Sequence, residues 1–234
     1  MESGGEKTRV IFTAHQPSYL PWLGLFAKIA KADVFAIFDV AQFERHSFEN
    51  RNSIRTHTGR HMLTVPVELN GHMTGKASGI RIATGPWARK HVRSIELAYQ
   101  KAPFFKDYFE PIAKIIGGNH EKLHDLNNEL LFFLLRALNI KTKVVKASAY
   151  YPVGEKSGLV LDLCRKLGAT TYIFGENGRD YADVEAFTKA GVKVEFQDYR
   201  YPTYPQIHGG FEQNLSVIDL LFNHGPKSLG ILNV

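Results

Sequence analysis

The sequence predicts an α/β fold: a Rossmann-like, three-layer, mostly parallel sheet with helices on both faces and a helical segment in the middle of the chain. Two observations lead to this prediction. Short apolar runs alternate with amphipathic segments at both ends of the chain. Between them, residues 87–138 repeat apolar residues three and four apart, which is the spacing of helices. Sheets of this kind bind ligands at the carboxyl ends of their strands, so we look for functional residues there.

The first part of the chain is a strand, a helix and a second strand. Residues 8–14 form the first strand, and the helix covers residues 22–32 with Pro21 as its first helical residue, because the fixed φ of proline suits that position. The continuous apolar run at residues 34–38 is typical of an interior parallel strand. Residues 39–60 are polar and rich in turn formers, and we expect no regular element there.

The remaining elements follow from the same patterns. We expect strands at residues 62–69, 79–83, 141–147, 171–174 and 192–199. We expect helices at residues 87–100, 104–116, 125–138, 157–167, 183–190 and 216–223. Asp125 is a good N-cap for the third of these helices. No internal repeat divides the chain, so we expect one domain, residues 8–234, after a disordered tail, residues 1–7.

Composition and charge exclude several classes of protein. The 234 residues are 44% hydrophobic and 22% charged, which is ordinary for a globular protein and excludes a disordered one. The longest apolar run has six residues, 130–135, so we expect no membrane span. The start of the chain lacks the apolar region of a signal peptide, and a single cysteine fits a reducing compartment, so we expect a cytoplasmic protein.

The net charge of +6 fits an anionic ligand. Lysine and arginine are spread over the whole chain, and the densest stretch, residues 81–101, reads as the solvated face of one helix. A small anionic substrate therefore suits this charge as well as nucleic acid does, and nucleic acid is not the partner that we expect.

The most informative segment is the loop that follows the first strand. In eight residues it carries an imidazole, an amide, a phenol and an indole, on His15, Gln16, Tyr19 and Trp22. A chain reversal needs none of these groups, so we predict that they bind substrate beside the helix N-terminus. The alternative is that His15 and Trp22 only pack beneath the loop.

A second polar group follows the second strand. Asp39, Gln42 and the cluster of Asn50, Arg51 and Asn52 come after the apolar run. Neighbouring parallel strands end at the same sheet edge, so Asp39 is expected near the loop of residues 15–22. We predict that His15 or Asp39 is the general base and that Arg51 clamps an anion. The alternative is an ion pair between Arg51 and Asp39 that orders the loop.

Three other sequence patterns give weaker evidence of a functional site. The HExxH spacing at His120 and His124 straddles an expected helix start and lacks a third ligand, so we predict no metal site. Cys164 lies on an apolar helical stripe, as expected of a buried, inert thiol. The stretch 199–206 has three tyrosines beside prolines, and Tyr204 could stack on a base or sugar or belong to a loop that covers the core.

Seven segments in order along the chain resemble one family. They are HQPSYLPWLG, ADVFAIFDVAQF, ENRNSIRT, LTVPVEL, W-x3-H at Trp87 and His91, YQKAPFF and NLSVIDLLFNHG. Together they resemble the WbqC-like family over residues 10–230. The family pattern includes the residues of both polar groups and adds Tyr204 and Gln206 as expected substrate-binding positions.

The resemblance implies a role in surface polysaccharides of the O-antigen type. We expect an enzyme that transfers an acyl or aminoacyl group to the amine of a nucleotide-linked amino-deoxy sugar. One alternative is an ATP-dependent carboxylate–amine ligase of nucleotidylyltransferase-like type, which would need ATP and Mg²⁺. Another is a non-catalytic protein that binds the sugar nucleotide. The sequence leaves open the acyl donor, the sugar, the oligomeric state, and whether His91 belongs to the site or packs against Trp87.

Overall fold

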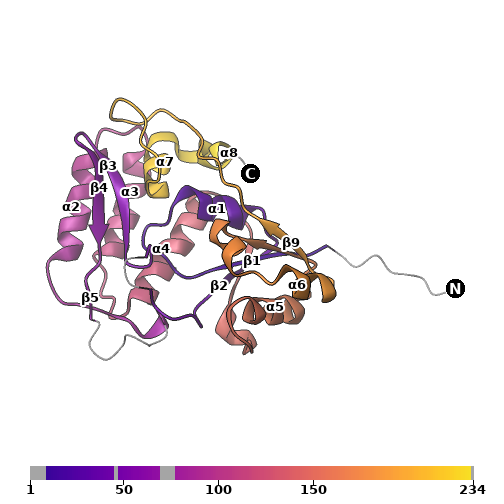
Figure 1. Cartoon of the computed structure of the whole chain (residues 1–234). Helices are drawn as coiled ribbons and strands as arrows, with labels where there is room; N and C mark the ends of the chain where they lie inside the picture. The colour runs from indigo at the N-terminus through magenta and orange to yellow at the C-terminus, as the bar shows by residue number, and fades with distance from the viewer. Residues whose placement is uncertain (1–8, 45–46, 69–76, 233–234) are drawn as a thin grey trace.

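The structure, a computed structural model, describes residues 9–44, 47–68 and 77–232 (Figure 1). The expected tail at residues 1–7 and the outer ends of two expected strands, Thr8 and Leu69, lie outside the described residues.

A five-stranded parallel sheet forms the centre of the molecule. Its strands are β1 (Ile11–His15), β2 (Val34–Ile37), β7 (Lys143–Lys146), β8 (Thr171–Phe174) and β9 (Lys193–Phe196). Their order in the sheet is β7-β2-β1-β8-β9, and every neighbouring pair is parallel. The chain therefore builds outward from β1 in one direction and then crosses back to add β8 on its other side. This reversal is the topological switch point at which Rossmann-like folds bind ligands.

Helices cover both faces of the sheet, as predicted. Along β2, Val34 and Ala36 belong to one core cluster, whereas Phe35 and Ile37 belong to the other. The first cluster includes the apolar side of α5 (Lys156–Leu167) and of α6 (Val184–Lys189). The second includes α1 (Leu23–Ala30) and the apolar residues of the helical middle segment. Because both faces of the strand are buried, its residues are apolar without alternation.

A long segment between β2 and β7 stands beside the sheet, at the left of Figure 1. It contains the β-hairpin of β3 and β4, a second short strand pair of β5 and β6, and three helices. The elements are β3 (Arg51–Thr56), β4 (Gly59–Thr64), β5 (Val67–Glu68), η1 (Ala77–Gly79), β6 (Arg81–Ile82), α2 (Trp87–Tyr99), α3 (Phe105–Ile116) and α4 (Leu123–Ala137). The predicted helical middle segment is thus confirmed.

The last part of the chain returns to the helical side. It contains α7 (Val217–His224), η4 (Gly225–Lys227) and α8 (Ser228–Ile231). Earlier in the chain, the 3₁₀ turn η2 (Ala147–Tyr150) follows β7, and the 3₁₀ turn η3 (Glu176–Asp180) follows β8. A single β-bridge joins Trp22 to Ser216, and the Val217 N–H donates to the Pro21 carbonyl at 2.8 Å. The loop after β1 is therefore tied to the start of α7.

Four local predictions are wrong. The single strand expected at residues 62–69 is divided, because Pro66 has no N–H to continue the ladder: β4 ends at Thr64, and β5 pairs in a different sheet. The expected irregular region at residues 39–60 contains most of the β3–β4 hairpin, because its buried polar residues are satisfied within the protein: the Asn52 amide donates to the Leu20 carbonyl at 2.7 Å. Pro21 does not begin α1, whose first residue is Leu23, since the bridge to Ser216 keeps Trp22 extended. Asp125 is not the N-cap of α4 but lies in its first turn, and Lys122 occupies the cap position.

Among the described residues, no helix is both long enough and apolar enough to cross a membrane.

Candidate functional site

A cavity of about 490 Å³ opens at the carboxyl ends of β1 and β8, at the switch point of the sheet. Ala14 and His15 at the end of β1 line one side, and Gly175 after β8 lines the other. Its size is within the range of small-molecule sites. Position in the fold and size together make this cavity the candidate active site.

The loop after β1 contributes His15, Gln16 and Trp22 to the lining. The His15 Nδ1 lies 2.8 Å from the Gln16 carbonyl, which can only accept, so Nδ1 carries the proton and Nε2 is left as an acceptor. The Trp22 indole packs edge-on against the His15 ring, with ring centroids 5.2 Å apart, and in a tilted arrangement against Phe48, with centroids 5.0 Å apart. The predicted loop thus presents an oriented imidazole to the cavity.

Burial keeps that imidazole neutral. Burial, together with the nearby positive charge of Lys28, lowers the pKa of His15 to about 4. At neutral pH, His15 is therefore an uncharged hydrogen-bond acceptor and a weak proton acceptor.

Lys28 is a buried cation in the cavity wall. It comes from α1, its side chain is 3% exposed, and its Nζ donates to the Ala14 carbonyl at 3.2 Å. That is its single hydrogen bond within the described part of the chain, and no described carboxylate forms an ion pair with it. Burial lowers the pKa of Lys28 to about 8, so the amine is mostly protonated at pH 7. Within the described residues, this ammonium has N–H groups without an acceptor, and no carboxylate lies within ion-pair distance of it.

Three carboxylates lie in the same lining: Glu44, Glu49 and Glu176. Glu49 is 4% exposed, and its Oε1 accepts from the Glu44 N–H at 2.9 Å. Burial raises the pKa of Glu49 to about 7 despite that bond. A carboxyl group with a pKa near the working pH is suited to accept and release a proton.

Aromatic side chains close the rest of the cavity. Phe48, Tyr181, Tyr199 and Tyr201 line it, and the rings of Tyr199 and Tyr201 meet edge-on at 5.1 Å. The Tyr199 hydroxyl is buried and has no hydrogen-bond partner among the described residues. Buried hydroxyls normally have a partner, so this group is available to a ligand.

Gly178 allows the turn after β8 to approach the strand. A Cβ at this position would lie 2.5 Å from the Phe174 Cβ, so a larger residue would push η3 away from β8. Glycine therefore fixes the wall that carries Glu176 and Asn177.

Of the residues predicted from the sequence, the structure brings His15, Gln16 and Trp22 into the cavity lining. The Gln16 amide also donates to the Gln42 carbonyl at 2.9 Å, so Gln42 neighbours this loop through its backbone. Tyr19 is fully buried, and its hydroxyl bonds the His91 Nδ1 at 2.9 Å. His91 also packs against Trp87, at 5.4 Å, and it is not part of the cavity lining.

The second polar group separates from the cavity. Asp39 follows β2 at the same sheet edge as His15, as predicted, but its carboxylate accepts from the backbone N–H and the hydroxyl of Ser148, at 2.9 and 2.6 Å. The Asn50 amide donates to the Val65 carbonyl at 2.9 Å. Asn50, Arg51 and Asn52 lie at and beside the start of β3, outside the cavity lining. The structure thus gives Asp39, Asn50 and Asn52 contacts that stabilise loops.

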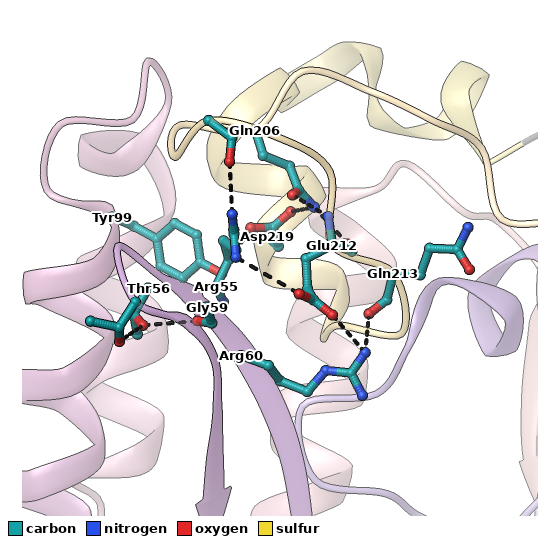
Figure 2. A network of polar contacts seen from close by, with 11 residues as sticks. Arg55, Thr56, Gly59, Arg60, Tyr99, Gln206, Glu212, Gln213 and Asp219 are labelled. Carbon is teal, nitrogen blue, oxygen red and sulfur yellow. Dashed lines mark hydrogen bonds and ion pairs between the residues drawn. The ribbon is translucent and has the colours of Figure 1, made fainter.

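Tyr204 and Gln206 meet at a different place, around the buried carboxylate of Asp219 in α7. Figure 2 shows Gln206 beside Asp219. The hydroxyls of Tyr99 and Tyr204 each donate to Asp219 at 2.9 Å, and the Gln206 amide donates at 3.0 Å. Beside it, Glu212 pairs with Arg60 at 2.8 Å. This network ties the C-terminal loop to α2 and the hairpin.

Among the cavity residues that were not predicted are three charged ones, Lys28, Glu44 and Glu49. For Lys28 a signal existed, since it is the only charged residue in the apolar helix LGLFAKIA. A helix that is apolar all round is buried, and a lysine within it is buried too. Glu44 and Glu49 stand in the polar stretch 39–60, which resembles ordinary surface.

Metal-binding groups do not gather in the described residues: no three side chains of His, Cys, Asp or Glu there could hold one ion. Glu121 and the two histidines of HEKLH lie at the start of α4, where His120 bonds the Ile115 carbonyl at 3.0 Å. Cys164 is fully buried in the core, and burial raises the pKa of its thiol to about 12, which keeps the thiol protonated.

Comparison with known proteins adds the family. The model of the WbqC-like protein family matches residues 16–231. The chain is 34% identical over 215 residues to the uncharacterized protein Rv1507c of Mycobacterium tuberculosis, a match that covers 91% of this chain and 93% of that protein. No solved structure gives a significant match.

Proposed function

The chain belongs to the WbqC-like protein family, and from this premise we propose that it is an enzyme of surface-polysaccharide biosynthesis of the O-antigen type. It transfers an acyl or aminoacyl group to the amine of a nucleotide-linked amino-deoxy sugar, in the cytoplasmic location expected from the sequence. The observation that carries the proposal is the charge layout of the cavity, in which the buried Lys28 ammonium lies among three glutamates.

The Lys28 ammonium, which has no ion pair among the described residues, indicates that the ligand carries an anionic group. A buried charge without a counter-ion is costly, and a phosphate or carboxylate of the substrate would remove that cost on binding. Lys28 binds this group in the proposal, and the Tyr199 hydroxyl is a second donor. The aromatic side chains around them suit a base or sugar ring.

The carboxylates of the cavity indicate that the same ligand also carries an amine. Glu44, Glu49 and Glu176 outnumber the single lysine in the lining and attract a positively charged ammonium. Sugar nucleotides that carry an amine have an anion and an amine in one molecule, as this layout requires.

The chemistry of amide formation fits the pKa of Glu49. The bound ammonium first releases one proton to solvent, because only the uncharged amine can attack the acyl carbonyl. The amine then loses a second proton as the new C–N bond forms and the leaving group departs with its electron pair. Glu49, with a pKa of about 7, accepts that proton in the proposal. The neutral His15 accepts a hydrogen bond from the amine and orients it. Asp39, the other base considered, is occupied by Ser148.

The experiment is ligand binding followed by turnover. Wild type is tested by thermal shift and calorimetry with dTDP- and UDP-linked amino sugars, acyl-CoA and ATP·Mg²⁺, and amide products are sought by mass spectrometry. A ligand at about 100 times its Kd stabilises the fold by about 2.7 kcal/mol. We expect an amino-sugar nucleotide to bind, Lys28→Met to abolish that binding, and Lys31→Met to leave it unchanged, because Lys31 is exposed at the end of the same helix.

The remaining outcomes separate the alternatives. Pyrophosphate release from ATP and a carboxylic acid would replace acyl transfer by ATP-dependent ligation. Binding that survives His15→Ala, with no amide formed by wild type from any donor, would support a non-catalytic sugar-nucleotide-binding protein. Failure of every sugar nucleotide to bind wild type would refute the proposal.

A further inference from the structure

A second concave surface lies between the hairpin strand β4 and the helix α2. It encloses about 800 Å³ and shares no lining residue with the candidate active site. We refer to it as the β4–α2 groove. Its size is that of a small-molecule site.

The β4–α2 groove is lined by cations. Arg89, Lys90 and Arg93 come from the first two turns of α2, and no aspartate or glutamate is among the lining residues. Arg93 forms an ion pair with Glu96 at 2.6 Å. Arg89 and Lys90 are exposed and have no ion pair within the described ranges. The sequence suggested only a solvated helix face here, but the structure places this charge in a groove.

Two arginines of the hairpin, Arg55 and Arg60, have partners outside the groove. On the same hairpin, Arg60 pairs with Glu212 at 2.8 Å, and Arg55 donates to the Gly209 carbonyl at 2.8 Å (Figure 2). Among the described residues that line the groove, the positive charges without an ion pair, Arg89 and Lys90, are adjacent in α2 and lie within one helical turn. This length matches two or three phosphates of one small molecule, whereas nucleic acid requires a longer track.

The groove also has a fixed, partly apolar wall. His91 is 7% exposed, and its ring is held by the Tyr19 hydroxyl at 2.9 Å and by Trp87. Burial lowers the pKa of His91 to about 4, so the ring is uncharged at neutral pH. On β4, Met62 is 48% exposed and lines the same groove. An anion with an attached apolar ring suits such a surface better than an isolated anion does.

We propose that the β4–α2 groove binds the phosphates of a nucleotide at a site separate from the candidate active site. Arg89 and Lys90 are the phosphate-binding residues, and the Met62 side chain contacts the nucleoside. This site does not depend on the reaction proposed above, because it involves none of the residues of that cavity.

The test is calorimetric titration with inorganic pyrophosphate and with ADP. The variant is Arg89→Ala/Lys90→Ala, whose side chains are exposed, and its melting temperature verifies folding. We expect its affinity for both probes to fall at least tenfold. Lys101→Ala, an exposed lysine just beyond the other end of α2, is the matched control and should bind as wild type does. Lys28→Met should retain this binding, which separates the groove from the cavity.

Two results would overturn the proposal. One is equal affinity of wild type and Arg89→Ala/Lys90→Ala for pyrophosphate and ADP. The other is binding of single-stranded oligonucleotides that tightens with their length and exceeds the affinity for ADP. The second result would make the groove part of a nucleic-acid track, with the steep salt dependence of such contacts.

Discussion

Replacing Lys28 by methionine is expected to stabilise the ligand-free protein at neutral pH. Methionine has a similar length and suits the buried, apolar surroundings of α1. The substitution removes a buried ammonium that has one hydrogen bond and no ion pair in the described part of the chain.

The size of the effect follows from the pKa. Burial lowers the pKa of Lys28 from 10.5 to about 8. At 1.36 kcal/mol for each pKa unit, the protonated lysine costs the folded state about 3.4 kcal/mol. Loss of the hydrogen bond to the Ala14 carbonyl offsets about 1 kcal/mol of that gain. The net stabilisation at pH 7 is therefore about 2–3 kcal/mol.

The pH dependence has a definite sign. The folded-state pKa lies below the unfolded one, so the penalty is fully present below pH 8 and fades between about pH 8 and 10.5. Urea unfolding of wild type and Lys28→Met at pH 7, 9 and 10.5 should show an advantage of the variant that shrinks to zero or reverses. Lys31→Met should show no such trend. A Lys28→Met protein less stable than wild type at pH 7 would refute the idea of an uncompensated buried charge.

Three further substitutions test other parts of the structure. Wild-type turnover should fall as the pH drops below about 7, because Glu49 becomes protonated. Glu49→Gln should lower turnover about 10²–10⁴-fold and remove this pH dependence. A wild-type profile that is flat between pH 6 and 8 would contradict the role of Glu49 as the base. Asp219→Ala leaves two buried hydroxyl donors, on Tyr99 and Tyr204, without their acceptor and should cost about 2–6 kcal/mol in urea unfolding, whereas a loss below about 1 kcal/mol would mean that the network carries little stability. Gly178→Ala should cost about 1–3 kcal/mol, because its Cβ would meet the Phe174 Cβ at 2.5 Å; Gly158→Ala, with open space at that position, is the control and should be neutral, and equal stability of the two variants would contradict the packing argument.

The sequence predicts those elements of the fold whose residue pattern follows from their own burial. The strand at Val34–Ile37 is apolar on both faces because both faces are covered, and this pattern is visible without any knowledge of the partners. The hairpin strand Arg51–Thr56 has no such pattern. Two of its buried residues, Asn52 and Ser53, are polar. Burial of Asn52 is tolerated because its amide donates a hydrogen bond to the Leu20 carbonyl, which is distant in sequence.

The same distinction applies to the site. His15, Gln16 and Trp22 follow a strand directly, so their place at the cavity is a consequence of local order along the chain. Tyr204 and Gln206 are placed by the return of the C-terminal segment to Asp219, which no spacing encodes. Glu49 reaches the cavity through the loop before β3, and its pKa depends on burial by segments far away in sequence.

The position of β1 at the centre of the sheet has a consequence during synthesis. Thr13 in β1 donates its hydroxyl to the carbonyl of Ile173 in β8, 160 residues later. At about 5–20 residues per second, the ribosome needs about 8–32 s to make that stretch. Through this interval β1 has β2 as a neighbour but lacks β8, so one edge of the nascent sheet stays open to pairing with other chains. The yield of folded protein in cells should therefore depend on chaperones that cover this edge until translation has passed β8.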